Sequence, residues 1–212
     1  MSEILGTAIL VIFGVAGGAQ ITLSHGLQGN GLTGPVCWGV GAYVAIIATA
    51  NKSGAQLNPA ISISLSVFKM QDWQKTGIYC GAQMAGAFIG SILVFVNYLQ
   101  AILIYSNHQF LVPPVNGATA QIFATFPTQF DPSWKYNQSP TNYECFFDQF
   151  IGTMMLLMAL QAVLDNKNAL FEKDRFPQTM ALTLVAVGSA FGYNCQGAVI
   201  TISITIELCF FL

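Results

Sequence analysis

The chain has 212 residues, of which 8% are charged and 54% are hydrophobic, and its mean hydropathy is +0.58. Soluble domains carry roughly 25% charged residues, so this composition excludes an ordinary globular enzyme and predicts a multi-span protein embedded in membrane lipid. A net charge of −2 without a run of basic residues excludes nucleic acid as a partner.

Long apolar runs without charge mark the expected spans in chain order. We expect five full transmembrane helices, at Ile4 to about Thr22, Val36 to Ala50, Thr76 to about Ile104, Phe146 to Leu164, and Pro177 to Tyr193. A shorter uncharged run, which begins at Pro59, lies between the second and third of these spans.

That shorter run predicts a re-entrant half-helix. Asn58 is a good N-cap, and Pro59 is favoured as the first helical residue because its missing N–H would have no partner there. From Pro59 to Phe68, at about 1.5 Å per residue, the helix would cover about 15 Å, half of a hydrocarbon core of about 30 Å. The half-helix therefore enters the membrane and stops inside it.

The segment before Asn58 is expected to line a pore. Non-helical backbone is tolerated at membrane depth only when it is buried in protein or lines a watery cavity. The carbonyl groups expected to face this pore belong to Gly54, Ala55, Gln56 and Leu57.

Six of the seven basic residues flank the half-helix or follow the fourth span. The positive-inside rule makes that side cytoplasmic, and counting the spans brings the same two loops together. We therefore expect a cytoplasmic N-terminus and an extracellular connection over residues 105–145.

The two halves of the chain show a short similarity. Glu3 to Thr7 reads Glu-Ile-Leu-Gly-Thr, and Asp148 to Thr153 reads Asp-Gln-Phe-Ile-Gly-Thr. Repeats of three spans have opposite orientations and place interrupted helices at the bilayer midplane. We expect one domain, with a first repeat over residues 1–104, a re-entrant loop over 51–68 within it, and a truncated second repeat over 146–212.

Three stretches together resemble the major intrinsic protein family of aquaporins and glycerol channels. They are Ser53 to Ala60 (Ser-Gly-Ala-Gln-Leu-Asn-Pro-Ala), Gln83 to Phe88 and Gly192 to Asn194, within a match from Glu3 to about Val199. The glycerol-conducting branch is favoured by Phe123 to Pro127, Phe147 to Thr153, and Trp38. The resemblance implies an all-α, aquaporin-like inverted repeat and a homotetramer with one pore per subunit.

The resemblance also implies roles for individual residues. Asn58, with Pro59 and Ala60, forms the first of two Asn-Pro-Ala motifs, and its amide donates to a passing hydroxyl oxygen. Trp38 stands 20 residues before Asn58 and is similar to one wall of the outer filter, although a Trp near a span end is often an interfacial anchor.

Glycines are expected in two settings. Gly188 resembles the filter position that is left small so that polyols fit, and Gly197 lies in the stretch that matches the approach to the second motif. Gly81, Gly86 and Gly90 are expected to allow close helix packing instead.

The family pattern changes after Val199, because the chain reads Ile200-Thr201-Ile202-Ser203 where family members read Asn-Pro-Ala-Arg. Residues 200–208 alternate apolar and polar, which is a strand period. We therefore expect the second half-helix and the sixth span to be missing or altered, and hypothesise an alternative splice, a retained intron or a gene-model error.

The leading functional hypothesis is a passive plasma-membrane channel for glycerol, other small uncharged solutes and water, which needs no cofactor or metal. The alternative is a non-conducting subunit that assembles with full-length relatives in mixed tetramers and modulates them. An enzyme is disfavoured, because the acidic residues form no recognisable acid, base or nucleophile set and suit span ends; they are Glu3, Glu144, Asp148 and Asp165.

Overall fold

A computed structural model describes residues 1–112, 117–127, 140–165, 173–192 and 195–196. Its α-helices are α1 (Ser2–Leu23), α2 (Thr33–Ser53), α3 (Pro59–Val67), α4 (Trp73–Tyr105), α5 (Asn142–Leu164) and α6 (Phe176–Ala190). Two 3₁₀ turns are η1 (Ala120–Ile122) and η2 (Lys173–Arg175), and two short antiparallel strands are β1 (Phe126–Pro127) and β2 (Cys195–Gln196).

The helices follow the predicted spans closely. Four of them, α1, α2, α4 and α5, are long and apolar enough to cross a membrane. The half-helix α3 begins at Pro59 as predicted, and its last residue is Val67. By contrast, α6 has 15 residues, about 22 Å of helix where a span needs about 20 residues, so the count of five full spans stays a prediction.

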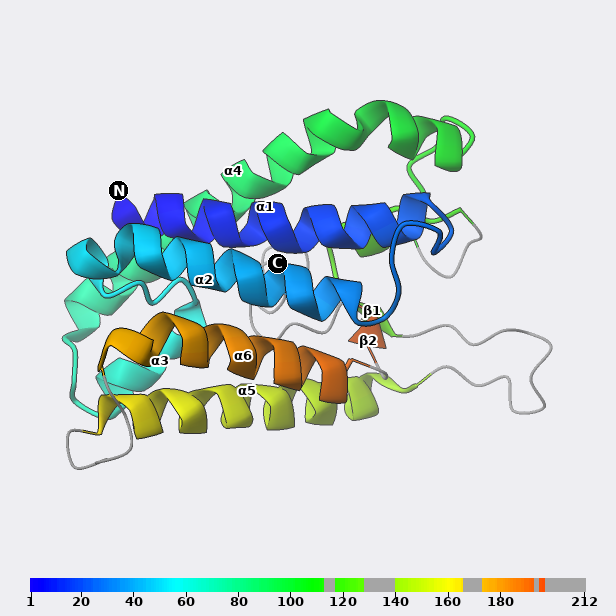
Figure 1. Cartoon of the computed structure of the whole chain (residues 1–212). Coiled ribbons are helices and arrows are strands. Elements are labelled where there is room, and N and C mark those ends of the chain that lie inside the picture. The colour runs from blue at the N-terminus through cyan, green and yellow to red at the C-terminus, as the bar shows by residue number, and fades with distance from the viewer. Residues whose placement is uncertain (113–116, 128–139, 166–172, 193–194, 197–212) are drawn as a thin grey trace.

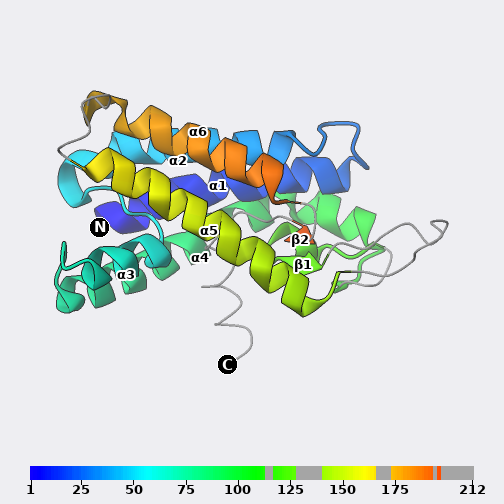
Figure 2. The ribbon, with the colours of Figure 1, turned by 90° about the horizontal axis from the view of Figure 1, so that it is seen from below.

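The longer helices form a bundle, and the short α3 lies at one end of it. In this bundle α1 packs against α2 and α4, α2 packs against α6, and α6 packs against α5, as Figure 1 shows. The half-helix lies against α4 and α5, and the turned view in Figure 2 places it at one end of the bundle. The tip of the re-entrant segment is thus enclosed by longer helices.

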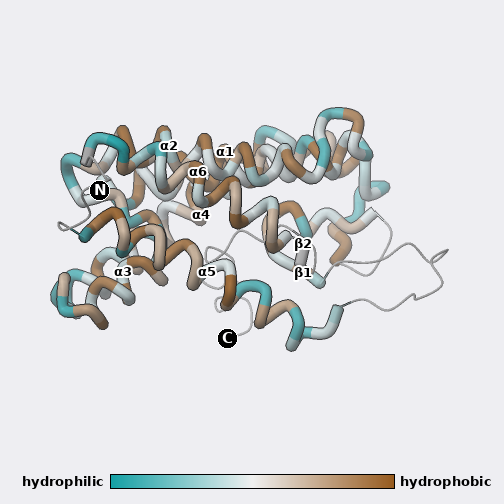
Figure 3. Tube along the Cα trace, turned by 60° about the horizontal axis from the view of Figure 1, so that its bottom comes forward, coloured by the Kyte–Doolittle hydropathy of each residue, from teal (hydrophilic) through white to brown (hydrophobic). Residues whose placement is uncertain are grey.

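Basic residues gather at the end of the bundle that carries the N-terminus. This end holds the end of α2, the start of α4, the end of α5 and the start of α6 (Figure 1). Lys52 lies in the last turn of α2, Lys69 follows α3, Lys75 is in the first turn of α4, and Arg175 precedes α6. Figure 3 shows hydrophilic residues at the helix ends and hydrophobic residues along the helices. This is the charge pattern on which the predicted orientation rests.

Two glycines let α4 approach α1 closely. A Cβ atom on Gly86 would lie 2.4 Å from the carbonyl oxygen of Ile4, and one on Gly90 would lie 2.8 Å from that of Ala8. The predicted packing role is therefore confirmed for Gly86 and Gly90. It is wrong for Gly81 within the described part of the chain, where a Cβ would meet nothing within 4 Å.

The Gly86→Ala variant is expected to be less stable than the wild type by about 1–3 kcal/mol, because the backbone of α1 would have to move away from the added methyl group. Thermal unfolding in detergent measures this. Gly81→Ala is the matched control on the same helix, and we expect no loss there, since Ala is the better helix former. Equal unfolding temperatures for the two variants would contradict the close approach of α1 and α4.

Candidate functional site: a cavity at the re-entrant loop

The chain reverses direction between α2 and α3 within a few residues. Gly54 ends α2 in the left-handed region with a φ of 86°. Ala55 and Leu57 also have positive φ values, 47° and 55°, which residues with a Cβ adopt rarely and at a cost of order 1–3 kcal/mol each. The surrounding structure must therefore hold this loop in place.

The Glu3 carboxylate supplies that support. Its Oε1 accepts the backbone N–H of Gln56 at 3.2 Å, and its Oε2 accepts the backbone N–H of Leu57 at 2.8 Å and the Nε2 amide of Gln83, also at 2.8 Å. Glu3 is only 2% exposed. A buried carboxylate is stable only when such donors compensate it, so Glu3 is a structural anchor of the loop.

Sequence reasoning missed this role, because it treated Glu3 as a residue at the end of a span. The available signal was an ionisable residue at the start of an uncharged span, which by default indicates function in a membrane protein. The loop residue Gln56 and the span residue Gln83 gave no comparable signal until the structure brought them to the same carboxylate.

Asn58 begins the half-helix as predicted. Its backbone is extended, and its Oδ1 accepts the N–H of Ala60 at 2.9 Å, with Pro59 at the first helical position. Because the oxygen caps the helix, the carboxamide nitrogen is the donor end of the side chain. The N-terminus of α3, which carries a partial positive charge of about +0.5, lies at the same place.

A polar network joins the buried side of α3 to α4. The Ser62 hydroxyl donates to Gln56 Oε1 at 2.6 Å and accepts from Gln83 Nε2 at 3.0 Å. One turn further along α3, the Ser66 hydroxyl bonds to the Thr76 hydroxyl. Buried polar groups with partners fix one arrangement, so this network sets the position of α3 within the bundle.

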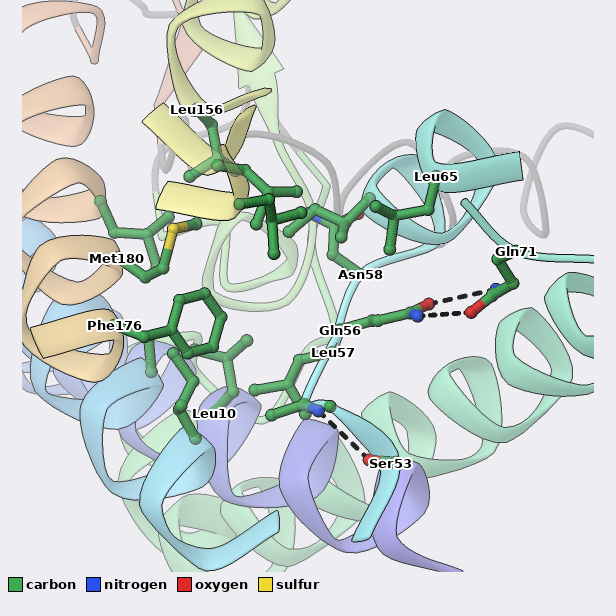
Figure 4. Close-up of a pocket in the computed structure, with 18 of the residues that line it drawn as sticks. Leu10, Ser53, Gln56, Leu57, Asn58, Leu65, Gln71, Leu156, Phe176 and Met180 are labelled. Atoms are coloured by element: carbon green, nitrogen blue, oxygen red, sulfur yellow. Dashed lines mark hydrogen bonds between the residues drawn. The ribbon is translucent and has the colours of Figure 1, made fainter. Parts of the chain in front are cut away.

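A cavity of about 330 Å³ lies beside the loop and the N-terminus of α3, as Figure 4 shows. Its polar end is formed by the loop and by the segment that follows α3. The residues there are Ser53, Gly54, Ala55, Gln56, Leu57, Asn58, Gln71 and Lys75.

The opposite walls of the cavity are apolar. They come from α1, α2, α3, α5 and α6, and include Leu10, Trp38, Ala42, Ile46, Ile61, Leu65, Leu156, Leu160, Leu164, Phe176, Met180 and Leu184. A cavity with a polar strip and an apolar wall suits a small molecule that carries both polar groups and a carbon skeleton.

The structure brings together six of the residues predicted for the site. Trp38 and the segment from Gly54 to Asn58 all line the cavity. Trp38 is half-buried, and its ring packs against Gly14, where a Cβ would lie 2.1 Å from the ring. This packing fixes the ring from α1.

The other predicted site residues lie elsewhere. Pro59 and Ala60 form the first turn of α3 and do not line the cavity in the described part of the chain. Gly188 is buried in α6 against Pro35, whose Cβ would be 3.2 Å from an added Cβ. Gly197 lies outside the described residues, as does the predicted strand-like tail.

The similarity between the two halves of the chain extends to buried polar positions. Gln149 corresponds to Glu3 in the repeat, and Thr153 corresponds to Thr7. The amide oxygen and nitrogen of Gln149 are buried without a hydrogen-bond partner among the described residues, and so are the hydroxyls of Thr7 and Thr153. Buried polar atoms therefore lie at corresponding positions in α1 and α5, but the three donors of Glu3 have no counterpart at Gln149 among the described residues.

A half-helix whose N-terminus and capping amide lie at a cavity between longer apolar helices is the arrangement of a multi-span membrane protein with a re-entrant segment. A model of the family described as "Major intrinsic protein" matches residues 1–204. The chain belongs to this family.

Known relatives support the same branch. The chain is 36% identical over 193 residues to Aquaglyceroporin-2 of Rhizophagus irregularis, a match that covers 91% of this chain and 58% of the relative. It is 34% identical over 194 residues to Aquaporin-9 of Homo sapiens, covering 92% and 62%. The chain thus spans about three-fifths of the length of these relatives.

A solved structure shows the same fold. The X-ray structure of the aquaglyceroporin from Plasmodium falciparum superimposes with a TM-score of 0.75 and 27% sequence identity, over 99% of this chain and 78% of that chain. The predicted resemblance to the aquaglyceroporin branch, and the aquaporin-like helical fold that it implied, are confirmed.

Proposed function

We propose that the chain is a passive membrane channel for glycerol, other small uncharged solutes and water. The observation that carries this proposal is the cavity whose polar strip, with the Asn58 amide and the N-terminus of α3, faces an apolar wall. Two of the matched proteins are named aquaglyceroporins.

The proposed path uses the two walls for different tasks. A hydroxyl group exchanges its hydrogen bonds to water for bonds to Asn58 and to the peptide groups of Gly54 to Leu57, while its carbon atoms slide along the leucines and Trp38. The positive end of α3 disfavours cations and protons at the same place. No covalent chemistry and no cofactor take part.

Swelling of vesicles tests this function. Proteoliposomes that hold the purified chain are mixed with a glycerol solution, which creates an inward glycerol gradient. The rate of swelling, followed by light scattering, is compared with that of empty liposomes. We expect faster glycerol and water entry and no conductance for sodium. A glycerol rate equal to that of empty liposomes would contradict the proposed channel.

The Trp38→Ala variant is expected to have a lower preference for glycerol over bulkier solutes, because it removes the largest apolar side chain from the cavity wall. The ratio of the two permeabilities should fall by roughly tenfold if the ring supplies about 1.4 kcal/mol of discrimination. Trp38→Phe, which keeps an aromatic wall, is the control. The pore role of Trp38 fails if the Ala variant and the wild type discriminate equally.

The expected assembly and orientation are part of the proposal. Large apolar side chains are exposed on the outer faces of the helices, among them Phe88 and Val96 of α4, Phe150 of α5 and Leu182 of α6. Such surfaces suit lipid or neighbouring subunits, so we propose a homotetramer or a mixed tetramer with full-length relatives. The basic end would face the cytoplasm, with the N-terminus, in the plasma membrane.

The sequence holds a single Asn-Pro-Ala triplet, at Asn58 to Ala60. This feature favours a second function. A non-conducting subunit would join full-length relatives and lower their flux. Co-expression with an intact relative separates the two functions, because only this alternative predicts no flux from the chain alone together with reduced flux from the mixture.

A further inference from the structure

Two glutamine side chains tie together the segments before and after the half-helix. Gln56 Nε2 donates to Gln71 Oε1 at 2.6 Å, and Gln71 Nε2 donates back to Gln56 Oε1 at 3.4 Å. Both residues line the cavity, and Figure 4 shows their amide groups facing one another. The amide pair therefore forms part of the polar wall.

The end of α3 brings Gln71 to this position. After the C-cap residue Phe68, Lys69 adopts a left-handed φ of 58°. The N–H of Met70 then donates back to the carbonyl of Leu65 at 2.8 Å, which is the hydrogen bond of a Schellman turn. This turn reverses the chain, so that Gln71 meets the loop that precedes α3.

Further hydrogen bonds hold the amide pair on both sides. Gln71 Nε2 donates to the Thr76 hydroxyl at 2.9 Å, and Gln56 Oε1 accepts from the Ser62 hydroxyl at 2.6 Å. Gln56 is 9% exposed, and Gln71 is half-buried. The orientation of the Gln56 amide thus depends on Gln71 from one side and on α3 from the other.

We propose that Gln71 is a positioning residue that sets the width of the cavity at its polar end. It does so by holding Gln56 and, through Gln56, the peptide groups of the loop. This inference rests on the proposed channel function and adds a determinant of solute size to it. While the pair is intact, each amide group supplies hydrogen-bond partners to the other. The cavity then keeps a width that fits a small polyol.

The loss of the Gln71 side chain acts on the wall through Gln56. It leaves the Gln56 amide without its partner across the gap. A loosened wall admits solutes with longer carbon chains, so discrimination by size falls while the Asn58 donor remains. Gln71 thus affects selectivity more than glycerol flux.

The test compares polyol permeabilities in proteoliposomes. We expect Gln71→Ala to raise the ratio of erythritol to glycerol permeability by roughly fivefold, the factor that one hydrogen bond commonly carries. Gln71→Glu keeps the acceptor for Gln56 Nε2 but replaces the Nε2 donor with an oxygen, which can accept from the Thr76 hydroxyl, so we expect its ratio to lie well below that of Gln71→Ala. Gln74→Ala, an exposed position on the same segment, is the matched control.

A double variant shows whether Gln71 acts through its partner. We expect Gln56→Ala with Gln71→Ala to have the same ratio as Gln56→Ala alone. Two results overturn the inference while leaving the proposed function intact. One is a Gln71→Ala variant that conducts glycerol with an unchanged ratio of erythritol to glycerol permeability. The other is a Gln71→Glu variant whose ratio is as high as that of Gln71→Ala. Absence of glycerol flux in the wild type overturns the proposed function itself.

Discussion

The Glu3→Ala variant is expected to lose about 3–5 kcal/mol of stability, because two backbone N–H groups and the Gln83 amide would lose a buried acceptor. The loop residues with positive φ would then relax, since Glu3 no longer holds them. Thermal unfolding in detergent measures the stability, and glycerol swelling measures the pore. We expect both to fall.

Glu3→Gln separates the acceptor from the charge. One side-chain oxygen remains to accept the N–H of Leu57, so we expect a smaller loss of stability than in the Ala variant. Asp72→Asn is the control for a lost negative charge, because Asp72 is exposed and its side chain makes no capping bond to α4. An Ala variant as stable as the Asp72 control would refute the anchoring role of Glu3.

The Asn58→Asp variant is expected to fold normally and yet to lose at least roughly tenfold in glycerol permeability, the factor that about 1.36 kcal/mol produces in a rate. A carboxylate oxygen still caps Ala60, and a negative charge at a helix N-terminus is stabilising. The change replaces the amide donor with a charged acceptor. Stopped-flow swelling and thermal unfolding, measured together, separate flux from folding.

Two further variants complete this comparison. Asn58→Ala removes both the cap and the donor, so it should lose flux and also about 1 kcal/mol of stability. Asn107→Asp makes the same chemical change in an exposed turn, where a φ of 51° suits either residue, and it should alter neither property. Normal glycerol flux in Asn58→Asp would remove Asn58 from the proposed path.

Much of the fold could be predicted from local sequence. The spans follow from uncharged apolar runs, and α3 begins where Asn58 and Pro59 predict a cap and a first turn. These signals are local: the cap and its proline are adjacent, and hydropathy is summed along one segment. The structure therefore changed helix ends by only a few residues, with α6 remaining shorter than its predicted span.

The contacts that hold the site could not be predicted in the same way. Glu3 and Gln83 meet across 80 residues of sequence, and Gln71 reaches Gln56 only because Lys69 turns the chain back. The glutamines are ordinary in their own segments, and an ionisable residue such as Glu3 at the start of a span indicates a function without naming its partners. The apolar wall from α5 and α6 likewise depends on packing between helices, which hydropathy along one segment does not specify.

An experimentally determined structure of the chain in lipid with bound glycerol tests the central claim most directly. We predict a glycerol hydroxyl oxygen within about 3 Å of the Asn58 carboxamide nitrogen, with the carbon atoms against the apolar wall that includes Trp38. An Asn58 side chain that faces lipid, or a helix from Pro59 that continues across the whole membrane, would contradict the account.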